Sequence, residues 1–150
     1  MKKILFVCTG NTCRSPMAEV ILKKKLRLAR LNGFKVSSAG TMANNGSLMS
    51  ENSLKALKLL GYRAYAFRSK QADAKVLLEH DIIICMTRGH KLPICNFPNV
   101  YTVDELTGLG DVVDPYGGSL QDYVFASHQI EKACDIIIQI LQKYNGEIKL

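Results

Sequence analysis

The stretch that decides this fold reads Ile4-Leu5-Phe6-Val7-Cys8-Thr9-Gly10-Asn11-Thr12-Cys13-Arg14-Ser15-Pro16. Its first four residues are all apolar, which is typical of a strand buried on both faces. A polar loop follows, and a helical pattern starts at Pro16, with Ser15 expected as the N-cap. A strand, a tight loop and a helix N-terminus in this order gather backbone N–H groups and the positive end of a helix dipole at one point. That arrangement suits a bound phosphate.

Beyond this loop, apolar strands alternate with helical patterns. We expect strands at residues 3–8, 34–38, 81–87 and 99–103, and helices at residues 16–32, 50–60, 70–79 and 120–144. A short helix interrupted by Pro93 and a long glycine-containing loop at residues 107–119 complete the pattern. The alternation predicts one α/β domain over residues 1–150 with a parallel sheet. Such sheets bind ligands beyond the C-terminal ends of their strands, where the Cys8 loop lies.

The composition of the chain narrows the class of protein. Its 150 residues are 47% hydrophobic and 22% charged, which is ordinary for a soluble globular protein. No apolar run approaches the roughly 20 residues of a transmembrane helix, and the first apolar run ends too early for a signal peptide. We therefore expect a cytoplasmic protein with no membrane partner. The five cysteines, an odd number, favour free thiols, and no paired Cys or His spacing predicts a metal site.

The formal net charge is +7. A basic surface can attract nucleic acid or phosphorylated substrates. Five of the basic residues fall on the outer face of the first helix, where we expect them to be solvated: Lys23, Lys24, Lys25, Arg27 and Arg30. The chain has no basic tail and no aromatic-rich binding motif. We therefore expect no nucleic-acid partner and a monomer or weak dimer.

Cys8 and Arg14 stand at the two ends of the loop, with five residues between them. Loop N–H groups, the helix dipole and Arg14 all favour the thiolate of Cys8, which can attack phosphorus and form a phosphocysteine. The planar fork of Arg14 can hold two phosphoryl oxygens. Gly10 and Asn11 tolerate the left-handed backbone that such a loop requires. The expected phosphate-binding residues are Thr9, Gly10, Asn11, Thr12, Cys13, Arg14 and Ser15, the last also steadying Cys8 through its hydroxyl.

A second group must protonate the leaving atom, and Asp114 is the candidate general acid. It lies in the loop Asp111-Val112-Val113-Asp114-Pro115-Tyr116-Gly117-Gly118-Ser119. Pro115 restricts the backbone of Asp114, and Tyr116 is expected to form an aromatic wall of the substrate pocket. Asp111 is the alternative acid. The scattered histidines His80, His90 and His128 receive no role.

Three motifs together resemble a known family. Cys8-x₅-Arg14-Ser15-Pro16, Ser38-Ala39-Gly40 and Asp114-Pro115-Tyr116 are similar to those of the low-molecular-weight protein tyrosine phosphatases, in order and over essentially the whole chain. The resemblance implies a four-stranded parallel sheet flanked by helices on both faces. It also implies hydrolysis without a metal or cofactor, with Cys8 as nucleophile, Arg14 as phosphate ligand and Asp114 as general acid.

Two positions depart from the phosphotyrosine-specific members of that family. Thr12 stands where they usually carry a bulky aliphatic residue, and Gly117 where they carry a second aromatic residue. Both features resemble the bacterial protein arginine phosphatase branch instead. A threonine hydroxyl suits a guanidinium, whereas an aliphatic side chain favours a flat apolar ring. We therefore expect phosphorylated proteins as substrates, phosphoarginine before phosphotyrosine.

Other interpretations remain open. Cys13 shares the loop with Cys8, so oxidation can join the two thiols and shield the nucleophile, although Cys13 can equally be a small core residue. A thiol-dependent arsenate reductase on the same scaffold would use two more cysteines, for which Cys85 and Cys95 are candidates. A non-catalytic phosphate-binding module is the third alternative.

Overall fold

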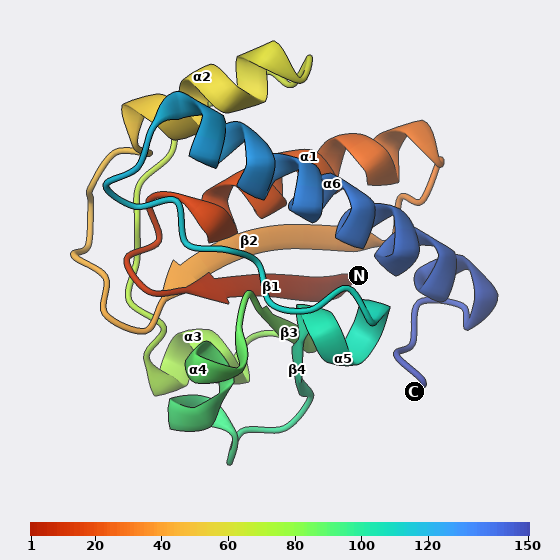
Figure 1. Cartoon of the computed structure of the whole chain (residues 1–150). Coiled ribbons are helices and arrows are strands. Elements are labelled where there is room, and N and C mark those ends of the chain that lie inside the picture. Colours follow the sequence, from red (N-terminus) through yellow and green to blue (C-terminus); the bar gives the residue numbers. More distant parts are fainter.

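The computed structural model describes residues 1–150 and contains the predicted four-stranded parallel sheet with helices on both faces (Figure 1). The strands are β1 (Lys2–Cys8), β2 (Phe34–Gly40), β3 (Ile82–Cys85) and β4 (Val100–Thr102), and their spatial order is β2-β1-β3-β4. The chain thus adds β2 on one side of β1, and later adds β3 and β4 on the other side. The end of β1 is the point where the strand order reverses, which is where sheets of this kind bind ligands. Cys8 is the last residue of β1.

Helices pack on both faces of the sheet (Figure 1). One face carries α1 (Arg14–Leu28), α2 (Glu51–Leu59) and α6 (Leu120–Lys143), while α3 (Ala74–Leu78), α4 (Arg88–Lys91) and the 3-10 turn η1 (Leu92–Ile94) lie on the other; α5 (Val103–Thr107) follows β4 and contacts α6. Side chains of β1 alternate between two cores: Ile4 and Phe6 face α1 and α6, whereas Leu5 and Val7 face the opposite side. Both faces of β1 are therefore buried, as its sequence predicted.

The predicted apolar stripe of the last helix is confirmed. All six of its members are buried: Tyr123, Ala126, Ile130, Ala133, Ile137 and Leu141. They recur at helical spacing, so one face of α6 covers α1 and α2. Ser119 caps the helix, because its side chain accepts a hydrogen bond from the backbone N–H of Asp122.

The N-terminus of α1 differs from the prediction. Cys13, not Ser15, occupies the N-cap position, and the helix already begins at Arg14. No side chain caps it. The prediction was wrong because Ser15 Oγ is engaged elsewhere, with Cys8, Asn11 and the carbonyl of Ala39.

The C-terminus of α1 comes earlier than predicted. The helix ends at Leu28 because Arg30 adopts a left-handed φ of 57°. The N–H groups of Arg30 and Leu31 bond back to the carbonyls of Arg27 and Leu26, a Schellman arrangement that glycine usually supplies. The expected helix end at residue 32, before Gly33, is therefore wrong.

Two further elements were misjudged. The helix expected at residues 70–79 shrinks to α3, because Asp73 caps it and Gln71 forms an isolated bridge with Gly40. Helix α5 was missed altogether, although Thr102 and Glu105 form a capping box at its start. A Thr-x-x-Glu signature marks such a helix in the sequence.

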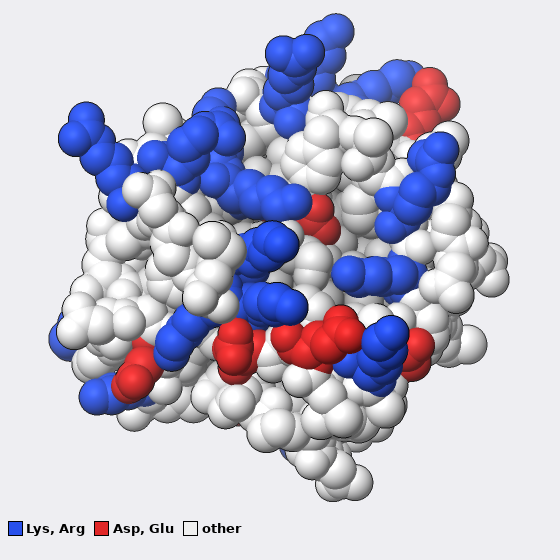
Figure 2. Space-filling view, turned by 180° about the vertical axis from the view of Figure 1, so that it is seen from behind, with Lys and Arg blue, Asp and Glu red and all other residues white.

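Basic side chains crowd the face shown in Figure 2, with acidic ones below them. We expected the lysines of α1 to be solvated, but some of them also form ion pairs or hydrogen bonds with other residues of the protein. Lys23 pairs with Glu19 at 3.0 Å, and Lys24 donates to the carbonyl of Gly61 at 2.9 Å. Among the helices, none combines the length and apolarity needed to cross a membrane.

Candidate active site

The loop between β1 and α1 presents a row of backbone N–H groups. No backbone amide of residues 9–15 donates a hydrogen bond to the protein. Asn11 takes a left-handed φ of 57°, as predicted, whereas Gly10 does not. Free amides that converge at a helix N-terminus form a concave site for an anion. The loop therefore has the donors that a phosphate requires.

A buried polar network fixes this loop from behind. Asn11 is fully buried; its Nδ2 donates to Ser15 Oγ at 2.8 Å and to Ser38 Oγ at 3.0 Å, and its Oδ1 accepts from the N–H of Lys70. Ser38 in turn donates to Glu19 at 2.9 Å. The side chains of Asn11 and Ser15 thus hold the loop instead of lining the cavity in front of it.

Ser15 lies directly against the candidate nucleophile. Its Oγ is 2.9 Å from Cys8 Sγ, and both residues are buried. When Cys8 is a thiolate it can only accept, so the hydroxyl of Ser15 must donate to it. A donor at this distance stabilises sulfur as an anion, both as the attacking atom and as a leaving group.

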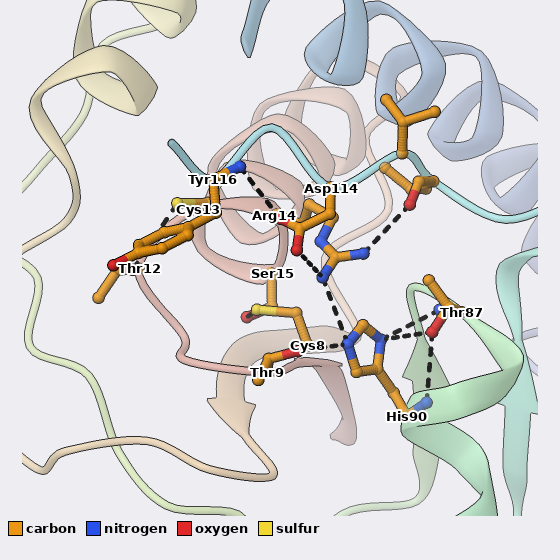
Figure 3. A network of polar contacts seen from close by, with 12 residues as sticks. Cys8, Thr9, Thr12, Cys13, Arg14, Ser15, Thr87, His90, Asp114 and Tyr116 are labelled. Carbon is orange, nitrogen blue, oxygen red and sulfur yellow. Dashed lines mark hydrogen bonds and ion pairs between the residues drawn. The ribbon is translucent and has the colours of Figure 1, made fainter. Parts of the chain in front are cut away.

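Arg14 joins the loop to the segment that carries the candidate acid (Figure 3). Its Nη1 donates to the carbonyl of Val112 at 3.2 Å, and its Nη2 lies 3.6 Å from Asp114 Oδ2. The guanidinium is buried, but the Asp114 side chain is 57% exposed. Asp114 Oδ1 also accepts from the N–H of Tyr116 at 3.1 Å. The acid therefore sits at the mouth of the site, accessible to a substrate.

His90 enters the same site from α4 (Figure 3). It is buried, and its Nε2 lies 2.9 Å from Thr9 Oγ1 and 3.4 Å from Arg14 Nη2. Burial and the positive charge of Arg14 lower the pKa of His90 to about 4. The ring is therefore neutral at physiological pH.

A cavity of about 330 Å³ opens in front of the loop. It is lined by Cys8, Thr9, Gly10, Thr12, Cys13, Arg14, Asn44, Ser47, Asp114 and Tyr116. Most of the predicted site residues thus meet at one place. Tyr116 is 80% exposed and forms an outer wall of this cavity.

The alternative acid Asp111 lies outside this cavity. It accepts a hydrogen bond from the N–H of Arg88 and lines a larger depression of about 630 Å³ between α4 and α5. That depression contains none of the loop residues. The geometry therefore favours Asp114 over Asp111.

The other cysteines occupy different environments. Cys13 is a free thiol whose Sγ lies 3.6 Å from Ser50 Oγ and 3.6 Å from Tyr123 OH, so it packs into the core as well as lining the cavity. Its protective disulfide with Cys8 stays a prediction. Cys85 has no exposed surface, and burial raises the pKa of its thiol to about 12, whereas Cys95 is exposed and lies outside the cavity. These positions do not favour a relay of thiols to Cys8.

Sequence reasoning missed four contributors to the site. They are His90, the carbonyl of Val112, and the cavity-lining residues Asn44 and Ser47. Only His90 had a usable signal: it follows shortly after the buried strand β3, which neighbours β1, so the C-terminal ends of the two strands lie together. No group of three or more His, Cys, Asp or Glu side chains is placed to hold a metal ion.

Known proteins share this architecture and sequence. The low molecular weight phosphotyrosine protein phosphatase family matches residues 3–146. A protein-arginine-phosphatase of Geobacillus stearothermophilus is 38% identical over 93% of this chain and 96% of its own length. The low molecular weight protein-tyrosine-phosphatase PtpB of Staphylococcus haemolyticus is 38% identical over 81% of this chain and 86% of its own.

A solved structure is also similar. It is the YwlE arginine phosphatase in a cysteine-to-serine variant with a phosphorylated active-site serine, with a TM-score of 0.87 and 32% identity over 95% of this chain and 97% of that one. The family match covers nearly the whole chain, including both the Cys8 loop and the Asp114 segment. The chain belongs to the low molecular weight phosphotyrosine protein phosphatase family.

Proposed function

We propose that this protein is a cysteine-dependent protein phosphatase that acts through a phosphocysteine, with phosphoarginine in proteins as its first substrate. One observation carries the proposal: Cys8 stands at the base of a loop of unbonded amides, 2.9 Å from the Ser15 hydroxyl, in a cavity that Arg14 and Asp114 also line. Anion donors, a nucleophile and an acid at one cavity are the set that covalent phosphoryl transfer needs.

The reaction proceeds in two steps on these residues. In the first, the Cys8 thiolate attacks phosphorus, an S–P bond forms and the P–N bond of phosphoarginine breaks, while Asp114 gives its proton to the leaving nitrogen. In the second, water attacks phosphorus, Asp114 takes a proton from the water and the thiolate leaves. Arg14 and the loop amides hold the phosphoryl oxygens throughout. The structure of the serine variant of the YwlE arginine phosphatase, with its phosphorylated active-site serine, supports a phosphoenzyme of this kind.

The choice of phosphoarginine rests on the walls of the cavity. Thr12, Asn44 and Ser47 line the cavity with hydroxyl and amide groups, and none of the lining side chains is aliphatic apart from the threonine methyl groups. A guanidinium carries several N–H donors and needs acceptors, whereas a phenyl ring needs apolar surface. Gly117 leaves open space next to Tyr116, because nothing lies within 4 Å of the position of its missing Cβ. One arginine phosphatase and one tyrosine phosphatase each share 38% sequence identity with this chain, so the choice between the two substrates is argued from the cavity.

The test compares phosphoarginine and phosphotyrosine peptides of the same sequence. We expect the native enzyme to have the higher kcat/KM for phosphoarginine, and Thr12→Ile to shift the preference by roughly tenfold or more towards phosphotyrosine, because a lost polar contact is worth about 1.4 kcal/mol. Cys8→Ser is the control, since it must lose turnover on both peptides while still binding inorganic phosphate. An unchanged preference in Thr12→Ile would leave phosphotyrosine, the alternative substrate, as the better assignment.

The partners follow from the proposed reaction. Phosphorylated proteins are the substrates, and the cytoplasmic location, the monomeric or weakly dimeric state and the lack of a nucleic-acid partner stay predictions.

A further inference from the structure

The imidazole ring of His90 makes four polar contacts, which together determine which ring nitrogen carries the proton. Its Nδ1 lies 3.2 Å from the backbone N of Thr87 and 3.0 Å from Thr87 Oγ1. The Thr87 amide always donates, so Nδ1 must carry a lone pair. The Thr87 hydroxyl accepts from the His90 N–H at 3.3 Å, which leaves its own proton to be donated to Nδ1.

The ring proton of neutral His90 therefore sits on Nε2. The nearest acceptor of that proton is Thr9 Oγ1 at 2.9 Å. Arg14 Nη2 at 3.4 Å is itself a donor, so it packs against the ring edge without sharing this hydrogen. A charged imidazolium in the same place would repel the guanidinium, and the lowered pKa of His90 agrees with a neutral ring.

The consequence falls on Thr9, which lines the cavity in front of Cys8. A hydroxyl that accepts from His90 keeps its own proton free, and that proton has to find another acceptor. A phosphoryl oxygen held by the loop supplies one. Without His90, the Thr9 hydroxyl would be free to turn and present a lone pair instead.

We propose that His90 is a positioning residue of the phosphate site: its Nε2–H holds the Thr9 hydroxyl so that Thr9 donates to a phosphoryl oxygen. The inference rests on the proposed function. It concerns binding of the phosphoryl group, so it applies to any phosphorylated substrate of this site.

Kinetics on a small aryl phosphate, with inorganic phosphate as competitive inhibitor, test the role of His90. We expect His90→Leu to raise both KM and the inhibition constant of phosphate about tenfold, since a hydrogen bond to a charged group is lost. His90→Gln keeps an N–H donor and should stay within about threefold of the native enzyme. Adding His90→Leu to Thr9→Val should cost less than about twofold more than Thr9→Val alone, because the two residues act as one unit.

His80→Gln is the matched control, since His80 is also partly buried and hydrogen-bonded, but to Ser37 and to the Val76 carbonyl outside the site. Nitrogen NMR of the native enzyme at pH 7 gives a second readout that does not depend on variants folding: Nε2 must be protonated and Nδ1 not. The opposite tautomer, or fully additive effects of His90→Leu and Thr9→Val, overturns the proposal. A native enzyme that hydrolyses no phosphate ester or phosphoarginine contradicts the proposed function instead, while the NMR result still decides the arrangement of His90.

Discussion

Gly40 carries only a hydrogen atom where other residues carry a side chain, and this allows the loop between β1 and α1 to approach it closely. A Cβ at this position would lie 2.3 Å from the carbonyl oxygen of Thr9 and 2.9 Å from the backbone N of Asn11. Both are backbone atoms of the loop, so they cannot move without displacing it. The second motif of the family resemblance, Ser38-Ala39-Gly40, thus has a steric reason in this structure.

Gly40→Ala should therefore destabilise the protein by about 1–3 kcal/mol, the usual cost of overpacking, and weaken phosphate binding as well. Urea unfolding and the inhibition constant of inorganic phosphate measure the two effects. Gly33→Ala is the matched control, because nothing lies within 4 Å of its Cβ position. Equal behaviour of the two variants would show that the loop does not depend on the close approach at Gly40.

The two aspartates of the acid segment make a matched pair for a second prediction. Asp114→Asn should lower kcat/KM, which reports the first step, by about 10²–10⁴-fold for poor leaving groups and far less for good ones, because only poor leaving groups need a proton. Asp111→Asn should keep nearly full activity, since Asp111 bonds Arg88 outside the cavity. The measurement is kcat/KM over a series of aryl phosphates of rising leaving-group pKa. If the loss of activity in Asp114→Asn were the same for good and poor leaving groups, Asp114 would not be the acid.

At the scale of secondary-structure elements, apolar patterns predicted the long helices and the buried strands well, and the short helices poorly. The stripe of α6 and the apolar run of β1 could be recognised because burial alone decides them. The true ends of α1 could not, because the Ser15 hydroxyl contacts Cys8 and Arg30 adopts a conformation usually left to glycine. Short elements such as α5 depend on one capping box rather than on periodicity.

The packing of α6 leads to a prediction about stability without loss of chemistry. Ile137 is 1% exposed in the main core, so Ile137→Ala should cost about 2–5 kcal/mol of unfolding free energy. The neighbouring Ile136 is only partly buried, so Ile136→Ala should cost clearly less. Urea unfolding compares the two, and KM should stay unchanged in both, since neither residue lines the cavity. Equal losses would mean that α6 is not held by the predicted stripe.

For the whole molecule, buried histidines and net charge act in the same direction on acid stability. Burial lowers the pKa of His90 to about 4 and also lowers that of His80, from an ordinary value of 6.5. The unfolded chain therefore takes up these protons as the pH falls through 6.5, while the native state still excludes them. Between pH 6.5 and 4 the native state must lose stability, and the net charge of +7 adds repulsion.

We expect the urea midpoint to fall steadily from pH 7 to pH 4.5. The double variant His80→Gln/His90→Gln should flatten that dependence, because both sites of proton uptake are then gone. His128→Gln is the control, since His128 is exposed. A double variant with the native pH dependence would assign the acid sensitivity to other groups.

The site as a whole could be predicted only in part. Cys8, Arg14 and Asp114 were predicted from their residue types and spacing, and the structure brings them together at one cavity. The Val112 carbonyl was not predicted, because a backbone oxygen has no sequence signature. His90 was not predicted either, because its place after β3 points to the site only once β3 is known to lie beside β1. The sheet order β2-β1-β3-β4, which brings α4 beside the loop, arises from the tertiary structure.

The bond from Arg14 to the carbonyl of Val112 spans 98 positions of the chain. During synthesis on the ribosome, Cys8 emerges among the first residues, whereas the proposed acid Asp114 emerges only after most of the chain has been made. A nascent chain therefore carries the Cys8 thiol before it contains the other residues of the proposed site. A chain that ends before Asp114 lacks the proposed acid, and we expect it to be inactive towards poor leaving groups.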